Sequence, residues 1–390
     1  MKIGILTLPF NGNYGGVLQN WALQQVLKRN GHDPVTINRH TYKPPLNNRR
    51  RLAYTIICAK TIINKFLKGK DNTYVSFPLS RNFTNEVSVA QFHKKFTNRN
   101  ICLSNPIYTT KELSHYLDQS SFDAIIIGSD QVWREEYSPA ITEYFLEWDT
   151  EYNNYITIAY AASFGISKNY ISPYNLIKCK GLIHKFSSIS VREDSGLEIL
   201  KKQFKVNATK VLDPTLLLSK DDYISLLKIK PKYNTSILTS YILDNNSDKQ
   251  AITSQTADSL NLTVTNLSLQ PNNRSNRIKS ILYWLNKIAS SQFIVTDSYH
   301  GCVFSIIFEK PFIAISNNER GLDRFLSLLN DIGLKHRLVN STEQYLKNKS
   351  HLIQPIDYKP VYQKLETLRN NSICYLRNAL TNNINNSTDI

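Results

Sequence analysis

Short apolar segments alternate with amphipathic ones along most of this 390-residue chain. In its first part we predict strands at Lys2–Thr7, Pro34–Asn38, Asp123–Ile127, Ile156–Ala161 and Ser187–Val191, and helices at Val17–Arg29, Ser88–Thr97, Ser172–Lys185 and Asp194–Gln203. Parallel strands need a long crossover connection, which a helix usually supplies. The alternation therefore predicts an α/β protein built on parallel sheets.

The segment from Leu212 to Leu216 contains Asp213-Pro214 and interrupts this pattern. After it we predict strands at Thr235–Leu243, Leu262–Leu267, Phe293–Thr296 and Phe312–Ile315, and helices at Ile278–Ala289, Gly301–Phe308, Gly321–Asn330 and Pro360–Leu380. We therefore expect two Rossmann-like domains, residues 1–213 and 214–358, followed by a C-terminal helix and frayed tail at 359–390. A cleft between two such domains is where ligands usually bind.

Bases outnumber acids, giving a net charge of +16. Eight bases and no acid lie between Lys43 and Lys70, within a predicted helical insertion at about residues 43–100. An excess of this size suggests a nucleic acid, an anionic membrane or an anionic substrate. Tyr54 and Phe66 are the aromatic residues interleaved with this basic run, and no nucleic-acid-binding motif is visible, so we expect no nucleic-acid partner.

The five cysteines are widely spaced and form no Cys-x-x-Cys pair, which excludes a disulfide framework or zinc knuckle and fits a reducing compartment. The apolar start, Met1 to Phe10, runs into Asn11-Gly12-Asn13 without a small-residue cleavage site, so we interpret it as a strand. No apolar run approaches the length of a membrane span. We expect a cytoplasmic protein.

A glycine-rich loop, Asn11 to Gly16, joins the first strand to the first helix. Its backbone amides and the positive end of the helix can hold an anion or sugar hydroxyls. The candidate ligand-binding residues here are Asn13, Gly15, Gly16 and Gln19. A tight turn that needs small residues is an equally good interpretation, because the spacing matches neither a dinucleotide-binding loop nor a P-loop.

Three further predicted strands end in candidate site residues. Gly128-Ser129-Asp130 places a carboxylate at the cleft edge, where Asp130 can act as a general base or can cap the next helix. Ser163 ends another strand. Arg192 ends a third, where it can bind a phosphate or carboxylate, or pair with a neighbouring acid.

The segment Thr296 to Gly301 is the best candidate for an anion site, because Ser298, His300 and the Gly301 amide converge on a predicted helix N-terminus. His300 can bind phosphate or donate a proton, and Asp297 can hold its tautomer. Arg320 and Arg324 follow the next strand and can reach the same cleft, or can lie on the helix surface. A single histidine can also be structural.

The ordered set of motifs resembles the polysaccharide pyruvyl transferase family over roughly residues 1–340. The motifs are Gly12-Asn13-Tyr14-Gly15-Gly16 with Leu18-Gln19 and Ala22-Leu23, Gly128-Ser129-Asp130-Gln131-Val132-Trp133, Ser190-Val191-Arg192-Glu193-Asp194, Asp213-Pro214-Thr215 and Asp297-Ser298-Tyr299-His300-Gly301. The resemblance implies a fold similar to B-type glycosyltransferases, with the acceptor on the N-terminal domain and the donor on the C-terminal one.

It also implies that phosphoenolpyruvate is the co-substrate, without a metal or other cofactor. The product is a pyruvate ketal on a sugar of a capsule, exopolysaccharide or other surface glycan, or on its precursor. His300 is then the phosphate ligand or proton donor and Asp130 the candidate base, while Arg192, Arg320 and Arg324 bind the anionic donor.

One position departs from the family pattern. Members commonly carry Arg-Leu-His-Gly where this chain has Ser298-Tyr299-His300-Gly301. Arg320 or Arg324 can substitute for that arginine, or the donor can differ. The alternative function is a nucleotide-sugar-dependent glycosyltransferase of similar fold, and a basic nucleic-acid-binding protein is a weaker one.

The basic run also has apolar residues at helical spacing, including Leu52, Ile56 and Ile63. It can present a basic amphipathic surface to an anionic membrane, where a lipid-linked glycan acceptor would lie. The same apolar stripe can instead pack on its own domain. Peripheral membrane contact is therefore a hypothesis that the sequence leaves open.

Overall fold

The computed structural model of the protein describes residues 1–10, 13–40, 94–149, 155–165, 171–227, 230–231, 236–267, 280–317 and 321–381. The basic run Lys43–Lys70, most of the predicted helix Ser88–Thr97, Arg320 and the end of the polar tail lie outside these residues. In the described part, no helix is long and apolar enough to cross a membrane.

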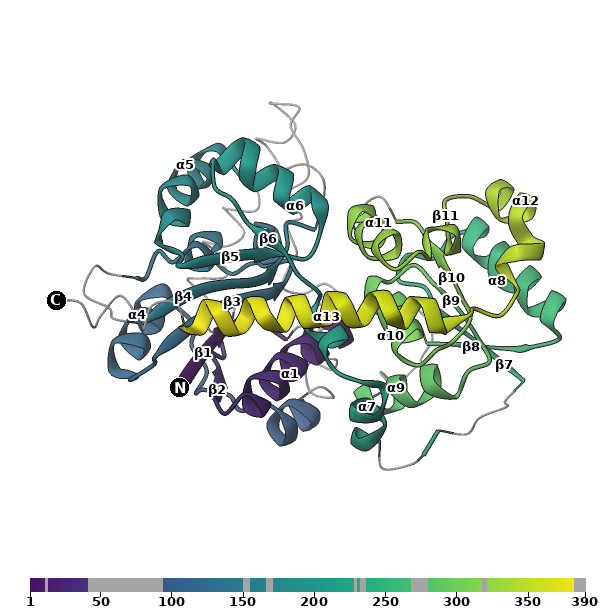
Figure 1. Cartoon of the computed structure of the whole chain (residues 1–390), viewed down its shortest axis with the longest axis horizontal. Coiled ribbons are helices and arrows are strands. Elements are labelled where there is room, and N and C mark those ends of the chain that lie inside the picture. Colours follow the sequence, from purple (N-terminus) through teal and green to yellow (C-terminus); the bar gives the residue numbers. More distant parts are fainter. Residues whose placement is uncertain are drawn as a thin grey trace, which may run out of the picture.

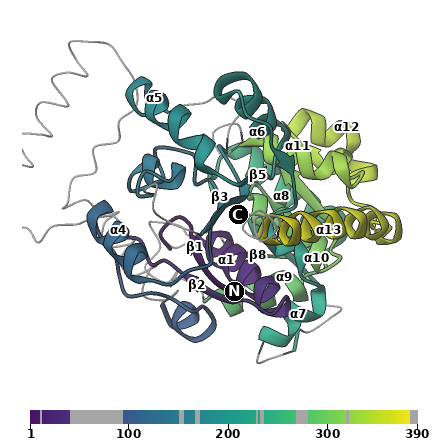
Figure 2. The ribbon, with the colours of Figure 1, turned by 60° about the vertical axis from the view of Figure 1, so that its left-hand side comes forward.

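The first sheet has six parallel strands in the order β2-β1-β3-β4-β5-β6. They are β1 (Lys2–Leu6), β2 (Asp33–Thr36), β3 (Ala124–Asp130), β4 (Ile156–Ala162), β5 (Ser188–Val191) and β6 (Thr209–Lys210). Every residue of the two central strands β3 and β4 is buried, as expected where helices cover both faces of a parallel sheet. Covering elements include α1 (Tyr14–Arg29), α4 (Thr110–Gln119), α5 (Pro173–Leu182) and α6 (Asp194–Ile199), as Figures 1 and 2 show.

The second sheet is also parallel, with the order β11-β10-β9-β7-β8. Its strands are β7 (Ile237–Tyr241), β8 (Thr263–Asn266), β9 (Phe293–Thr296), β10 (Phe312–Ile315) and β11 (Leu338–Val339). The helices around it are α8 (Ser247–Leu260), α9 (Ile281–Ser290), α10 (Tyr299–Ile307), α11 (Leu322–Asp331) and α12 (Thr342–Leu352), with α7 (Lys220–Leu226) between the sheets in the chain. The predicted boundary at residues 213 and 214 falls between β6 and β7.

One apolar core joins the two domains. Its buried residues come from α1, from α9 and α10 of the second domain, and from α13 (Tyr358–Thr381). Tyr14 of α1 stacks on Trp284 of α9 with ring centroids 5.3 Å apart, and Tyr223 meets Phe304 of α10 edge to face at 4.9 Å. Two further clusters lie under the other faces of the two sheets. The domains are therefore packed on each other as well as linked.

Helix α13 runs along both domains (Figure 1). In the second domain, the Tyr358 hydroxyl donates to the Lys310 carbonyl over 2.7 Å. In the first, the Leu212 amide donates to the Ser372 hydroxyl over 2.9 Å, and Arg377 Nε donates to Asn30. The predicted C-terminal helix is thus present, two residues longer at its start and one at its end, and it fastens the two domains together.

Two boundaries matter for the site. Strand β3 continues to Asp130, three residues beyond its predicted end, so that carboxylate belongs to the strand. Helix α10 begins at Tyr299, so His300 lies inside its first turn rather than in the loop before it.

Helices α4, α7, α8 and α12 were not predicted. Helix α8 has few apolar residues beyond Ile252 and Ala257 on its buried side, so its sequence lacks a clear apolar stripe.

Replacing Leu365 tests how much α13 stabilises the fold. This side chain is 1% exposed within the shared core. We expect Leu365→Ala to lower the free energy of unfolding by about 2–5 kcal/mol, measured by urea denaturation. The control is Leu346→Ala on α12, which is 53% exposed and should change it by about 0.5 kcal/mol or less. Equal effects would show that α13 adds no such stabilisation.

Candidate functional site

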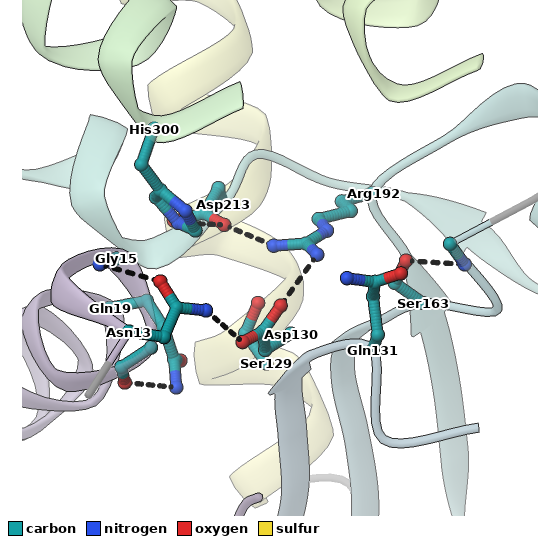
Figure 3. A network of polar contacts seen from close by, with 12 residues as sticks. Asn13, Gly15, Gln19, Ser129, Asp130, Gln131, Ser163, Arg192, Asp213 and His300 are labelled. Carbon is teal, nitrogen blue, oxygen red and sulfur yellow. Dashed lines mark hydrogen bonds and ion pairs between the residues drawn. The ribbon is translucent and has the colours of Figure 1, made fainter. Parts of the chain in front are cut away.

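A buried arginine forms the centre of the polar network in Figure 3. Arg192 follows β5, and its Nη1 lies 2.6 Å from Asp213 Oδ2 while its Nη2 lies 3.0 Å from Asp130 Oδ1. Its Nε lies 3.7 Å from Glu193 Oε2. Arg192, Asp213 and Glu193 have no exposed side-chain surface, so the network fixes the carboxyl ends of several strands of the first sheet in one arrangement.

His300 brings the second domain to this network. Its Nε2 lies 3.6 Å from Asp213 Oδ2, the oxygen that also binds Arg192. Its ring lies so close to Gly15 of α1 that a Cβ at Gly15 would be 1.9 Å from His300 Nδ1. The histidine thus lies between the two domains.

The prediction that Asp297 holds the tautomer of His300 is wrong. Asp297 accepts hydrogen bonds from the amides of Leu243 and Asp244 and forms an ion pair of 2.8 Å with Lys249. It therefore ties β9 to the end of β7 and to α8. Asp213 is the carboxylate beside the imidazole.

Asp130 occupies the end of β3 with a φ of 75°, in the left-handed region. Asn13, the N-cap residue of α1, lies with its Nδ2 3.5 Å from Asp130 Oδ2. Burial alone raises the pKa of Asp130, but the positive charges of Arg192, His300 and Arg324 outweigh it and hold that pKa below its usual value. The carboxylate is therefore ionised and is only a weak base.

Asp213 and Arg192 stabilise each other's charged forms. Burial raises the pKa of Asp213, yet the imidazole of His300, whose Nε2 lies 3.6 Å away, together with Arg192 brings that pKa well below the ordinary carboxyl range. Burial lowers the pKa of Arg192, but Asp130 and Asp213 raise it overall. Asp213 and Arg192 are consequently both charged at neutral pH.

Tyr299 lies between two guanidinium groups. The Cζ atoms of Arg192 and Arg324 are 5.1 Å and 5.3 Å from its ring centroid, within range of a cation–π interaction. Arg324 comes from the first turn of α11 and is buried, and burial together with the charge of Arg192 lowers its pKa to about 10. It remains a cation at neutral pH.

These residues border a cleft of about 810 Å³ between the domains. Six predicted site residues line it: Asn13, Gly16, Asp130, Ser298, His300 and Arg324. The other lining residues are Thr7, Leu8, Pro9, Phe10, Tyr14, Gln131, Glu136, Tyr137, Ser138, Tyr241, Leu243, Asp297 and Tyr299. The structure thus brings a histidine, an arginine, a carboxylate and an amide together from both domains.

The remaining predicted site residues in the described part lie behind the cleft wall. Gly15 is needed for the approach of His300, and a Cβ at Gly301 would lie 2.3 Å from Thr296 Oγ1. The Arg192 guanidinium forms ion pairs with Asp130 and Asp213. We therefore assign these three to positioning and packing, in place of the ligand contact that the sequence suggested.

Gln19 and Ser163 are also fully buried. Gln19 Nε2 donates to Thr7 Oγ1 and to the Gly16 carbonyl, which ties the first turns of α1 to the residue after β1. The Ser163 hydroxyl accepts from the Gly165 amide over 2.9 Å. Both support the loops around the cleft from behind.

Sequence reasoning did not identify Asp213 as the partner of His300. In the sequence, Asp213-Pro214-Thr215 interrupts the pattern of strands and helices and is one of the family motifs. In the structure, the buried side chain of Asp213 also caps the turn at Thr215. A carboxylate just after a strand of the first domain was the available signal. Its contact with a histidine 87 residues later depends on how the domains pack.

A second groove, of about 880 Å³, lies between α11, β11 and α12. The ionisable side chains that line it are Lys335, His336 and His351, which are exposed. It has no buried charged network comparable to that around Arg192, so the candidate site is the interdomain cleft.

Gly15→Ala tests the close approach of the two domains. The added methyl group would overlap the His300 ring, so we expect a loss of about 1–3 kcal/mol in the free energy of unfolding. The control is Gly181→Ala in α5, where no atom lies within 4 Å of the new Cβ and a gain of about 0.5–1 kcal/mol is expected. A Gly15→Ala variant as stable as Gly181→Ala would contradict the packing.

The low pKa of Asp213 predicts a stability that falls in acid. A carboxyl whose folded-state pKa lies below its unfolded value of about 3.9 stabilises the fold above that pH, and this contribution is lost as the pH drops toward the folded value. We expect Asp213→Asn to be less stable than wild type at pH 7 but to lose less on acidification to pH 3 in urea denaturation. Exposed Asp118→Asn should follow wild type at both pH values, and a parallel profile for Asp213→Asn would contradict the prediction.

Similarity to solved structures supports the fold. UDP-GlcNAc 2-epimerase from Neisseria meningitidis, solved with UDP-GlcNAc, aligns with a TM-score of 0.50 at 12% identity over 100% of both chains. The epimerase from Rickettsia bellii aligns at 0.46, with 10% identity over 97% of both chains, and the spinosyn rhamnosyltransferase SpnG at 0.45, with 9% identity over 96% of this chain and 99% of that one. The predicted α/β architecture, two Rossmann-like domains with parallel sheets that face each other across a cleft, is confirmed.

A search of curated proteins found no match to the chain. A model of the polysaccharide pyruvyl transferase family, in contrast, matches residues 13–319. This range includes the loop at Asn13, the carboxylates Asp130 and Asp213, and the histidine at the cleft. Because the match spans most of its 390 residues, the chain belongs to the polysaccharide pyruvyl transferase family.

Proposed function

We propose that the protein transfers the three-carbon unit of phosphoenolpyruvate to two hydroxyls of a sugar in a surface polysaccharide or its precursor, forming a cyclic pyruvate ketal and releasing phosphate. Family membership supports the reaction class. The observation that carries the proposal is that His300 and Arg324 of the second domain face Asp130 and Asn13 of the first across one cleft.

The donor carries a carboxylate and a phosphate, so its site needs cations. Arg324 and His300 line the cleft beside Ser298, which caps α10. Ser298 stands where related enzymes commonly carry an arginine, and we propose that Arg324 supplies the missing charge. Its planar guanidinium can bind a carboxylate or phosphate through two parallel hydrogen bonds.

The reaction balances with two proton transfers. Carbon 3 of the donor gains one proton, which makes carbon 2 electrophilic, and the first sugar hydroxyl adds to carbon 2 with loss of its own proton. The bond from carbon 2 to the phosphate oxygen then breaks, and the second hydroxyl closes the ring. Of the two protons released by the hydroxyls, one replaces that used at carbon 3 and the other leaves with phosphate.

We propose His300 as the residue that moves these protons or binds the leaving phosphate, since it lines the cleft and an imidazole can both donate and accept a proton. Asp130 is a weaker base because its pKa is lowered. Its proposed part is to accept a hydrogen bond from an acceptor hydroxyl and to orient Asn13. General acid–base catalysis of this kind contributes about 10²–10⁴ in rate.

The alternative is a glycosyltransferase that uses a nucleotide sugar. In the described part, the carboxyl edge of the second sheet carries Asp297 and Asp244, and Lys249 is already paired with Asp297. Both donors are anionic and would bind beside the same residues, so the binding experiment below distinguishes between them.

Binding of the donor provides the direct test. We expect phosphoenolpyruvate, and not UDP-sugars or GDP-sugars, to raise the melting temperature of the wild-type protein. Arg324→Lys keeps the charge but loses the planar fork, so its apparent Kd for phosphoenolpyruvate should rise about 10-fold or more. The control is Arg99→Lys, an exposed arginine away from the cleft, which should bind as wild type does.

Phosphate release with a panel of glycans completes the test, with His300→Gln expected to release phosphate about 10²-fold more slowly or worse. Stabilisation by nucleotide sugars alone would establish the alternative. No stabilisation by phosphoenolpyruvate, together with no phosphate release on any acceptor, would exclude the proposed reaction.

A further inference from the structure

The outer part of the cleft differs in chemistry from its inner end. Asp130, His300 and Arg324 at the inner end are buried and ionisable. At the rim, Tyr137 of the first domain is 38% exposed and Leu243 of the second is 39% exposed. Both belong to the small set of large apolar side chains that are exposed in the described part of the chain, and a single ligand in this cleft can cover both.

The ring of Tyr137 is held in place. Arg134 Cζ lies 4.4 Å from the ring centroid, and the Tyr137 amide donates to the Arg134 carbonyl over 3.0 Å. The Arg134 guanidinium is in turn fixed by Glu136, with Nη2 to Oε2 at 3.0 Å. The aromatic ring is therefore oriented before any ligand arrives.

The turn that carries this ring is anchored on both sides. Trp133 is buried, stacks on Phe145 and donates from its indole nitrogen to the Tyr144 carbonyl over 3.0 Å. The Glu135 carboxylate accepts hydrogen bonds from Ser172, at the N-terminus of α5, and from Asn175. A platform fixed in this way loses little conformational entropy on binding, which favours affinity.

The cleft is too large for phosphoenolpyruvate alone. Volumes of about 300–1,000 Å³ suit drug-sized ligands, and this cleft has about 810 Å³. Phosphoenolpyruvate is much smaller and would occupy the inner end, where the cations lie. The rim is left for the second substrate.

We propose that Tyr137 is the platform on which the pyranose ring of the acceptor stacks. A pyranose has an apolar face of C–H groups that packs on an aromatic ring, and equatorial hydroxyls that need polar partners at its edge. Glu136 and Ser138 flank Tyr137 and also line the cleft, so they can supply those partners. This inference rests on the proposed function and assigns the residue that recognises the acceptor.

The rim chemistry favours a neutral sugar. Its lining residues in the described structure are Leu8, Pro9, Phe10, Glu136, Tyr137, Ser138 and Leu243, none of which is a lysine or arginine. Glu136 is the charged member. Its carboxylate is paired with Arg134. An acidic sugar or a nucleoside phosphate would find no cation among these rim residues, whereas a neutral hexose can donate hydrogen bonds to Glu136 and Ser138.

Saturation-transfer NMR tests the proposal without turnover. The probes are the methyl glycosides of galactose, glucose and mannose, with methyl glucuronide and UMP as charged comparisons. We expect at least one neutral glycoside to bind wild type, and Tyr137→Ala to weaken it about tenfold. Tyr137→Phe keeps the ring and should bind within about threefold of wild type. The control is Tyr174→Ala on α5, a tyrosine 70% exposed and outside the cleft.

Binding of phosphoenolpyruvate, followed by thermal shift, should be unchanged in Tyr137→Ala, which also shows that the variant is folded. Unchanged glycoside affinity in Tyr137→Ala, or no binding of any neutral glycoside to wild type, would overturn the inference. So would tighter binding of UMP or the glucuronide. Failure of the proposed function is a separate result, because it appears as an absent phosphoenolpyruvate shift in wild type.

Discussion

The buried guanidinium of Arg192 is the interaction on which the site depends. It joins the end of β3, through Asp130, to the segment after β6, through Asp213, and that same carboxylate lies beside His300 of the other domain. Removing one partner of a buried ion pair costs about 3–5 kcal/mol, because the other charge is left without compensation. The cost of burying the charges of Arg192, Asp130 and Asp213 is thus offset within one network, and the cleft residues take their orientation from it.

The fold class was readable from the chain because strand and helix periods are local properties. Strands β9 and β10, at Phe293–Thr296 and Phe312–Ile315, match the predicted bounds. Helix α8 was missed because its mostly polar sequence has no clear apolar stripe, and packing against the sheet stabilises it where periodicity gives no signal. The predicted start of α10 was two residues late, because Ser298 caps the helix and Tyr299 is its first residue, which places His300 within the first turn.

The candidate site was predictable only in part, because several of its contacts depend on how the two domains pack in the tertiary structure. Asn13, Asp130, His300 and Arg324 were identified because polar residues after parallel strands meet at one edge. The role of Gly15 could not be inferred, since a glycine beside a helix N-terminus has the same sequence pattern whether it binds an anion or admits an imidazole from another domain. Arg192 was similarly ambiguous, because its partners Asp213 and Asp130 lie 21 and 62 residues away in sequence.

Helix α13 has a consequence for how the protein is made. The Tyr375 hydroxyl reaches the Ala159 carbonyl of β4 across 216 residues of sequence, and buried residues as late as Leu380 complete a core that begins with Ile3. During synthesis the first sheet emerges long before this cover exists, and its apolar face must wait for the last helix. Completion of this shared core is therefore a late, long-range event, and truncation of the chain before α13 would leave an aggregation-prone first domain.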